Sequence, residues 1–160
     1  MWKTKEIAIP TGFDFKLTAK SHGWYDLAPF RYDDEADVLF YVFTDHRNGK
    51  AIEAKISGIT TRILIELDAS VPDASPIPDR VRHILRVDDS ISEFHAMAAD
   101  DKLLSWVTVS GAGRLLRSPT VFEDMVKTLC TTNCSWSLTR KMVENLVTSL
   151  GVSSPSGSRS

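Results

Sequence analysis

No stretch of the sequence approaches the ~18–20 consecutive apolar residues that a membrane-spanning helix needs. The opening residues, MWKTKEIAIP, likewise lack the long apolar core of a secretion signal. We therefore expect a protein that is neither inserted in a membrane nor secreted, and that works in the cytoplasm or in association with the nucleoid.

Cysteine is scarce, since only Cys130 and Cys134 occur among the 160 residues. A structural zinc site uses about four Cys or His ligands, and the histidines (His22, His46, His83 and His95) are scattered over other segments. Redox pairs usually read C-x-x-C at the start of a helix, whereas Cys130 falls where a helix should end. The sequence therefore predicts no metal site and no cofactor, and two reduced thiols with Cys130 as a small packing residue.

An excess of charge of one sign is also missing, because the formal net charge is −2. A global basic field is thereby excluded, and any binding to nucleic acid has to come from a local surface. The segment GAGR (Gly111–Arg114) lacks the third glycine of a dinucleotide-binding loop and the lysine of a P-loop. We interpret it as a flexible joint, in which Arg114 and the nearby Arg117 are either solvated or in contact with phosphate.

What the sequence does contain is a β-rich first half. Residues 5–10 alternate as a short strand, and the spacing of Phe13 and Leu17 predicts a short helix that stops at Gly23. Three further strands are predicted as an antiparallel meander, over residues 37–45, 50–58 and 61–68. Apolar and polar residues alternate within them, so one face of the sheet should be buried beneath a helix.

The second half is predicted to be helical. One helix covers residues 79–87, and a shorter one follows with Ser90 or Ser92 as its N-cap. Thr120 and Glu123 form a capping box for a helix whose apolar residues share one face: Phe122, Met125, Val126, Leu129 and Cys130. Another helix runs from about Ser135 to a stop at Gly151, so the two form a hairpin with the turn TNCS.

These patterns predict an α+β fold in which an antiparallel sheet with helices occupies residues 1–112. Residues 113–151 form the helical hairpin that begins an all-α domain, and residues 152–160, rich in Ser, Gly and Pro, form a flexible tail or linker. Two helices bury little apolar surface on their own. We therefore expect the sequence to be a truncated or partial chain.

Two further groups of residues are candidates for a functional role. The segment from Ser21 to Asp34 is dense in aromatic residues and carries His22, which suggests either a catalytic base or stacking platform, or a loop pinned to a sheet edge. Paired aspartates occur where turns or helix starts are expected, and there carboxylates usually cap backbone amides rather than act as paired acid and base.

The stretch from Gly113 to Gly151 resembles the opening of the catalytic domain of helix-hairpin-helix (HhH-GPD) DNA glycosylases, the superfamily of 8-oxoguanine and 3-methyladenine DNA glycosylases. The resemblance rests on GRLLRSPTVFEDMVKTLCTTNCSW, which combines the arginine-flanked linker, the capping box, a helix and the polar turn in a fixed register. It covers about a quarter of the chain. It implies that the preceding region is the sheet domain of these enzymes, which is similar to TATA-binding protein.

The resemblance also implies a role in base excision repair, in which a damaged purine is flipped out of double-stranded DNA and its N-glycosidic bond is cleaved. Asn133 matches the residue that fills the gap left by the flipped base. Thr132, Cys134 and Arg117 are expected to contact DNA beside it, and the protein is expected to be a monomer.

This sequence also departs from the family. Cys134 replaces a second asparagine, and Leu138 stands where the 8-oxoguanine enzymes have an arginine that reads the opposite cytosine. No residue matches the DNA-gripping hairpin, the catalytic aspartate or the Schiff-base lysine, so no catalytic residue is assigned and the chain alone is expected to be inactive. Two alternatives stay open: a stand-alone DNA-binding or interaction module, and a small-ligand domain with a deep pocket at His22, Trp24 and Tyr25.

Overall fold

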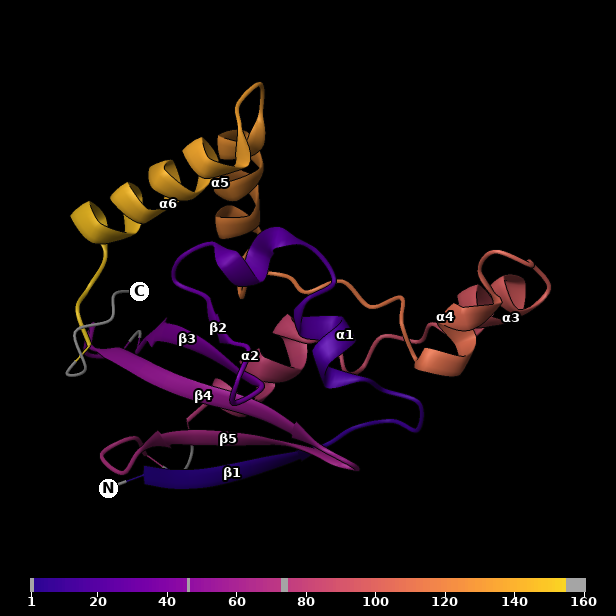
Figure 1. The fold of residues 1–160 in the computed structure, drawn as a ribbon. Coiled ribbons are helices and arrows are strands. Elements are labelled where there is room, and N and C mark those ends of the chain that lie inside the picture. Colours follow the sequence, from indigo (N-terminus) through magenta and orange to yellow (C-terminus); the bar gives the residue numbers. More distant parts are fainter. Residues whose placement is uncertain (1, 46, 73–74, 155–160) are drawn as a thin grey trace.

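The computed structural model describes residues 2–45, 47–72 and 75–154, so His46 lies outside the described residues. A twisted sheet forms the base of the molecule, and a pair of helices formed late in the chain stands above it (Figure 1). A second, smaller helical pair projects from one side. The fold is α+β, as the sequence predicts.

The sheet has five antiparallel strands in the order β1-β5-β4-β3-β2. Their bounds are Trp2–Ala8 (β1), Arg31–Asp33 (β2), Val38–Thr44 (β3), Ala51–Ile59 (β4) and Arg62–Asp68 (β5). The predicted meander of β3, β4 and β5 is confirmed, and β1 pairs with β5 along its whole length. The short edge strand β2 was not predicted, because three residues give too little alternation to detect.

One face of the sheet carries the core. Ile56 on β4 lies between Leu39 on β3 and Ile65 on β5, and all three are fully buried. The same register sets Ile7 beside Ile63 on the neighbouring pair of strands. Because side chains alternate across a strand, these apolar residues line a single face, as predicted from the sequence.

Helices α1 (Phe15–Ala19) and α2 (Ile77–Ile84) cover this buried face. Phe15 and Ala19 are the residues of α1 that enter the core, whereas Leu17 is exposed. The short helix predicted from the spacing of Phe13 and Leu17 is present, but Asp14 caps it after Phe13 and it ends at Ala19 instead of reaching Gly23. Helix α2 begins two residues earlier than predicted and buries Val81 and Ile84.

The projecting pair consists of α3 (Ser92–Ala99) and α4 (Ser105–Ser110). The N-cap of α3 is Ile91, without a side-chain hydrogen bond, so the predicted serine cap is wrong; the Ser90 and Ser92 hydroxyls bond to each other. Helix α4 was not predicted, because its β-branched residues disfavour a helix. Gly111 caps its C-terminal end with a left-handed φ of 73°, and a Cβ at this position would lie 2.0 Å from the Gly12 carbonyl oxygen.

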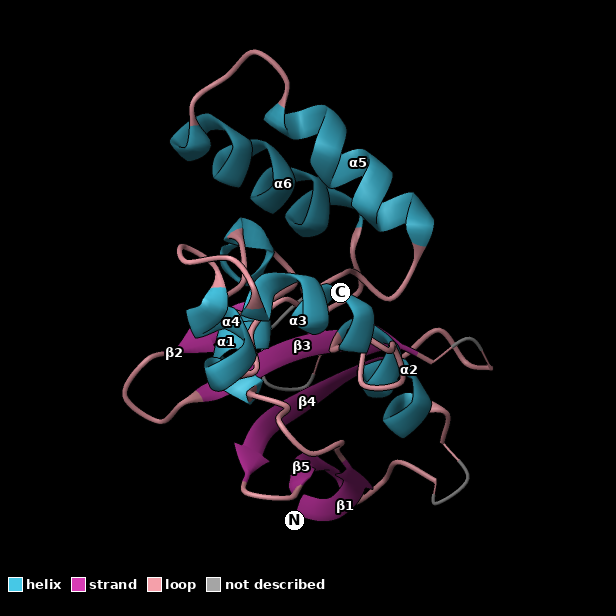
Figure 2. Cartoon of the chain, turned by 90° about the vertical axis from the view of Figure 1, so that its right-hand side faces the viewer, coloured by secondary structure: helices cyan, strands magenta, loops and turns pink. Residues whose placement is uncertain are grey.

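Helices α5 (Val121–Thr131) and α6 (Trp136–Leu150) form the predicted hairpin, and they lie side by side in Figure 2. Thr120 caps α5 by accepting a hydrogen bond from the Glu123 amide. The reciprocal half of the capping box is absent from the described contacts, because the Glu123 carboxylate binds other side chains. Helix α6 ends at Leu150 as predicted, although Gly151 is extended rather than left-handed.

After α6 the chain returns to the end of the sheet. Val152, Ser153 and Ser154 line a hollow there, and Ser154 is buried. These three residues belong to the segment that the sequence suggested as a tail; residues 155–160 lie outside the described residues.

Candidate nucleic-acid interface

The turn of the hairpin, residues 132–135, presents Asn133 at its tip. Asn133 is exposed and has a φ of 54°, in the left-handed region that asparagine tolerates better than most residues. Among the described residues, no hydrogen bond engages its side-chain amide. The tip therefore offers a donor and an acceptor to an outside partner.

The neighbours of Asn133 direct their polar side chains into the turn. The Thr132 hydroxyl donates to the Leu129 carbonyl at 2.7 Å, and the Cys134 thiol donates to the Cys130 carbonyl at 2.9 Å. Buried Thr139 adds a second donor to the Cys130 carbonyl, at 2.8 Å. The last carbonyls of α5 are thereby satisfied, which gives Thr132 and Cys134 a structural role; their contact with DNA stays a prediction.

Both cysteines are free thiols and are partly buried. The packing role expected of Cys130 stays a prediction. Within the described residues, no group of three or more His, Cys, Asp or Glu side chains is arranged to hold a metal ion.

Apolar side chains surround the tip. Leu129 and Leu138 are 67% and 46% exposed, and Trp136 is 40% exposed. Arg140 is the nearest cation of α6, and its guanidinium pairs with Asp26 at 3.2 Å. The tip therefore combines one free amide with apolar flanks, a chemistry suited to a gap in stacked bases rather than to phosphates.

Two tryptophan–aspartate hydrogen bonds hold the hairpin to a short 3-10 turn, η1 (Gly23–Asp26). The indole of Trp24 donates to Asp124 on α5 at 2.7 Å. In the opposite direction, the indole of Trp136 on α6 donates to Asp26 at 3.0 Å. Each helix of the hairpin is thus joined to the same four-residue turn.

Helix α5 carries a buried lysine. Lys127 is 1% exposed, and its ammonium donates to Glu123 at 2.7 Å and to Ser118 at 3.3 Å. The other Glu123 oxygen accepts from the hydroxyl of Tyr41 on β3 at 2.7 Å. Burial lowers the pKa of Lys127 and, together with the Glu123 carboxylate, raises the pKa of Tyr41 well above its usual value.

The linker that carries the arginines is packed onto the sheet domain. Arg117 donates to the His83 carbonyl at 2.7 Å, and Arg114, which is buried, donates to the Arg86 and Asp89 carbonyls at 3.1 Å each. Both guanidinium groups are therefore engaged within the protein, and the contact of Arg117 with DNA stays a prediction.

His22 serves the same linker. Its Nε2 lies 2.6 Å from the Leu116 carbonyl oxygen, and the Ser21 hydroxyl accepts from the Leu116 amide at 2.9 Å. The Nδ1 atom accepts from the Trp24 amide at 3.3 Å, so the His22 ring connects η1 to the linker. These contacts favour the alternative in which the aromatic segment from Ser21 to Asp34 fixes a loop, over the one in which His22 is a catalytic base.

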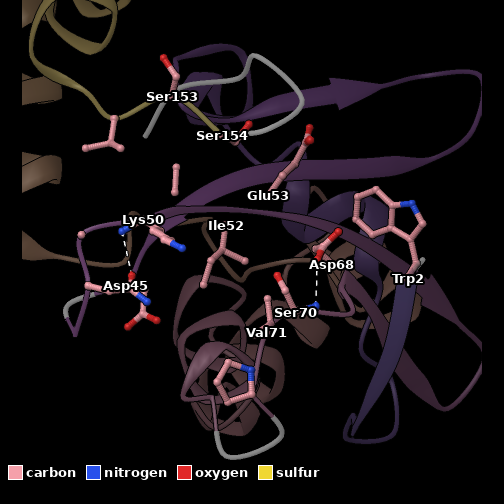
Figure 3. Close-up of a pocket in the computed structure, with 15 residues that line it drawn as sticks. Trp2, Asp45, Lys50, Ile52, Glu53, Asp68, Ser70, Val71, Ser153 and Ser154 are labelled. Atoms are coloured by element: carbon pink, nitrogen blue, oxygen red, sulfur yellow. Dashed lines mark hydrogen bonds between the residues drawn. The ribbon is translucent and has the colours of Figure 1, made fainter.

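The larger hollow described in the structure lies elsewhere, at the end of the sheet (Figure 3). It has a volume of about 820 Å³, and its lining includes Trp2, Lys50, Asp68 and Val152–Ser154. A smaller one of about 340 Å³ adjoins it beside Arg80. Neither includes His22, Trp24 or Tyr25, where the small-ligand alternative expects a pocket.

Sequence reasoning missed Asp26, Tyr41 and Lys127. Glu123 and Lys127 are four residues apart, a spacing that usually marks an exposed helix pair, and nothing in the sequence signals their burial. The apolar residues of α5 are exposed instead: Phe122, Met125 and Leu129 are each at least 60% exposed.

Among the described helices, none is long and apolar enough to cross a bilayer.

No family model and no curated protein matches this sequence. Solved structures, however, share its fold. A 3-methyladenine DNA glycosylase from Archaeoglobus fulgidus aligns over 92% of this chain and 50% of its own, with a TM-score of 0.71 and 16% identity.

An 8-oxoguanine glycosylase/lyase from Clostridium acetobutylicum aligns in its apo form over 94% of this chain and 50% of its own, with a TM-score of 0.65 and 14% identity. In complex with double-stranded DNA containing cytosine opposite 8-oxoguanine it gives a TM-score of 0.63 at 14% identity, over 94% of this chain and 49% of its own. The chain spans about half the length of the structures that it matches.

Proposed function

We propose that this chain is the sheet-bearing half of a base-excision DNA glycosylase, and that its hairpin turn enters double-stranded DNA at a damaged purine. The observation that carries the proposal is made at Asn133, which is exposed and has a left-handed backbone. Within the described part of the chain its side-chain amide has no hydrogen bond, whereas Thr132 and Cys134 beside it are bonded to the end of α5. The shared fold with DNA glycosylases supports the same conclusion.

The physical task of the tip follows from base flipping. Extruding a nucleotide costs a few kcal/mol in lost stacking and pairing, and it leaves a gap opposite an unpaired base. The Asn133 amide supplies both a donor and an acceptor to that base edge, while Leu129 and Leu138 provide apolar surface against neighbouring bases. Because Leu138 has no hydrogen-bonding group, we expect weak preference for any one opposite base.

Cleavage is a separate matter. Breaking an N-glycosidic bond requires a carboxylate to stabilise an oxocarbenium-like centre and to activate water or an amine. The sequence resemblance assigns that group, and the DNA-gripping hairpin, to no residue of this chain. We therefore expect the chain to bind damaged duplex as a monomer without excising the base, and an excising protein to require both groups from further sequence.

The test is binding to a duplex that carries a stable abasic analogue, with an intact duplex as reference. Asn133→Gly keeps the left-handed turn and removes the amide, so it should weaken binding to the abasic duplex by about tenfold. Asn145→Ala changes an exposed amide on α6 away from the tip and serves as the control. Equal affinity of the wild type and Asn133→Gly for the abasic duplex contradicts the insertion role.

The activity half of the proposal is tested with the coding sequence that follows Ser160. A glycine-rich hairpin followed by an aspartate, with or without a lysine, should appear there, and the extended protein should release a damaged purine from duplex DNA. A stop codon immediately after Ser160 favours the stand-alone binding module instead.

A further inference from the structure

Polar contacts hold the α5–α6 hairpin over the sheet at two places, the first turn of α5 and the start of α6. The apolar residues Phe122, Met125 and Leu129 of α5 are at least 60% exposed, so they do not fix the hairpin against the sheet. The contact closest to the tip is made by Asp26, from the segment between α1 and β2 that lies beneath the hairpin in Figure 1.

Asp26 binds the first two turns of α6 with one carboxylate oxygen. Oδ2 accepts from the Trp136 indole at 3.0 Å and pairs with the Arg140 guanidinium at 3.2 Å. These two residues are four positions apart and therefore lie on the same side of the helix. A single carboxylate thus contacts two successive turns on one side of α6.

Close packing reinforces this position. The Trp136 ring lies over Gly23, and a Cβ placed on Gly23 would be 2.4 Å from two ring atoms. The indole therefore occupies space that only glycine leaves free. Asp26 and Gly23 belong to the same short turn, so hydrogen bonding and packing act on Trp136 together.

The start of α6 is connected closely to Asn133. Trp136 follows Asn133 by three residues, and the intervening Cys134 is bonded to the end of α5 through the Cys130 carbonyl. Thr139 on α6 donates to the same carbonyl, so both α6 and the turn are bonded to the end of α5. We propose that Asp26 is a positioning residue, which holds the Asn133 amide in the orientation that enters the DNA gap.

This inference rests on the proposed function. It predicts that substituting Asp26 changes the DNA affinity in the direction opposite to the one expected from charge alone. Asp26 is an anion near the proposed DNA-binding surface, and it neutralises Arg140. By charge alone, Asp26→Ala should strengthen DNA binding, because it removes a negative group and frees a guanidinium. If Asp26 positions Asn133, the same substitution weakens binding to the abasic duplex by about fivefold.

The experiment compares four 160-residue proteins with the wild type on a fluorescent duplex containing a tetrahydrofuran abasic site. They are Asp26→Ala, Asn133→Gly, the double variant, and Glu6→Ala, which removes a comparably exposed carboxylate from the Arg62 pair at the far side of the sheet. The double variant should bind no more than twofold more weakly than Asn133→Gly, because Asp26 acts through Asn133. Glu6→Ala should bind as the wild type does.

The inference is overturned if Asp26→Ala binds the abasic duplex as tightly as the wild type or more tightly. It is also overturned if the loss of affinity in the double variant equals the product of the losses in the two single variants. If Asn133→Gly binds like the wild type, the proposed function fails, and the positioning role is then decided by NMR. Asp26→Ala should shift the Trp136 indole and the Asn133 amide resonances, while Glu6→Ala leaves both in place. An unmoved Asn133 resonance in Asp26→Ala also overturns the inference.

Discussion

The ammonium group of Lys127 lies 2.7 Å from Oε1 of Glu123, and the lysine side chain is 2% exposed while that of the glutamate is 21% exposed. The two partners are therefore not equivalent. Removing the glutamate leaves a buried charge without its counter-ion, whereas removing the lysine leaves a carboxylate that still accepts from Tyr41. The cost of breaking the pair should depend on which side is removed.

We predict that Glu123→Gln lowers the free energy of unfolding by about 3 kcal/mol, the usual cost of an unpaired buried charge. Lys127→Met replaces the ammonium with apolar volume beside Phe30 and should change stability by less than about 1 kcal/mol. Urea denaturation of both variants measures the difference. A larger loss in Lys127→Met than in Glu123→Gln would contradict this account.

The alkaline stability of the protein should depend on Tyr41. Its pKa is raised above the usual 10.0 by burial and by Glu123, so above pH 10.0 the unfolded phenol loses its proton while the folded one keeps it. The free energy of unfolding therefore falls as pH rises beyond 10.0. The lowered pKa of Lys127 acts in the opposite sense below its usual 10.5, because the folded lysine releases its proton first.

Phenolate absorbance and circular dichroism, followed together against pH, test this prediction. The Tyr41 ionisation should coincide with the loss of secondary structure rather than precede it. Tyr41→Phe should make the alkaline decline in stability shallower. A phenolate signal from Tyr41 in the folded protein near pH 10.0 would show that the phenol is not protected.

Gly23→Ala should displace the hairpin. Its Cβ would lie 2.4 Å from the Trp136 ring, so the indole has to leave its place over η1, at a cost of about 1–3 kcal/mol. The emission and the indole NMR resonance of Trp136 should change as well. Gly49→Ala is the control, because it meets no atom within 4 Å but carries a φ of 69°, and it should cost about 1 kcal/mol without altering Trp136.

The left-handed backbone of Asn133 separates its structural role from its binding role. Asn133→Ala should lower the free energy of unfolding by about 1 kcal/mol, since alanine is strained at a φ of 54°. Asn133→Gly should stay within about 0.5 kcal/mol of the wild type. Thermal unfolding of the pair measures the difference, and equal losses would show that the turn relaxes without strain.

The strands and the hairpin could be predicted from the sequence because their signals are local. Alternation in β4 and β5 fixed the buried face, and Thr120 with Ser135 marked where α5 and α6 begin. The turn also placed Asn133 at an exposed tip. Here local propensity and tertiary packing agree, which is the condition under which single-sequence reasoning succeeds.

The contacts between the sheet and the hairpin could not be predicted in this way. Asp26 and Trp136 are 110 residues apart, and Tyr41 and Glu123 are 82 apart. A lysine four residues after a glutamate has the pattern of a solvated pair, yet Lys127 is buried by the geometry of the linker and β3. Helix α4 was not predicted for a related reason: its packing against α3 overrides the low helix propensity of its β-branched residues.

The turn itself should depend on Thr139, whose buried hydroxyl donates to the Cys130 carbonyl at 2.8 Å. Thr139→Val keeps the shape of the side chain and removes this donor, leaving Cys134 as the other side chain bonded to that carbonyl. We expect a loss of about 1–2 kcal/mol, the cost of an under-satisfied buried group, and faster hydrogen exchange at the amides of the turn. Thr128→Val removes an exposed hydroxyl that donates to the Asp124 backbone carbonyl on the same hairpin, so it should cost less than about 0.5 kcal/mol. If the two valine variants lose stability equally, the Thr139 bond does not hold the turn, and the coupling between α6 and Asn133 must run through Cys134 alone.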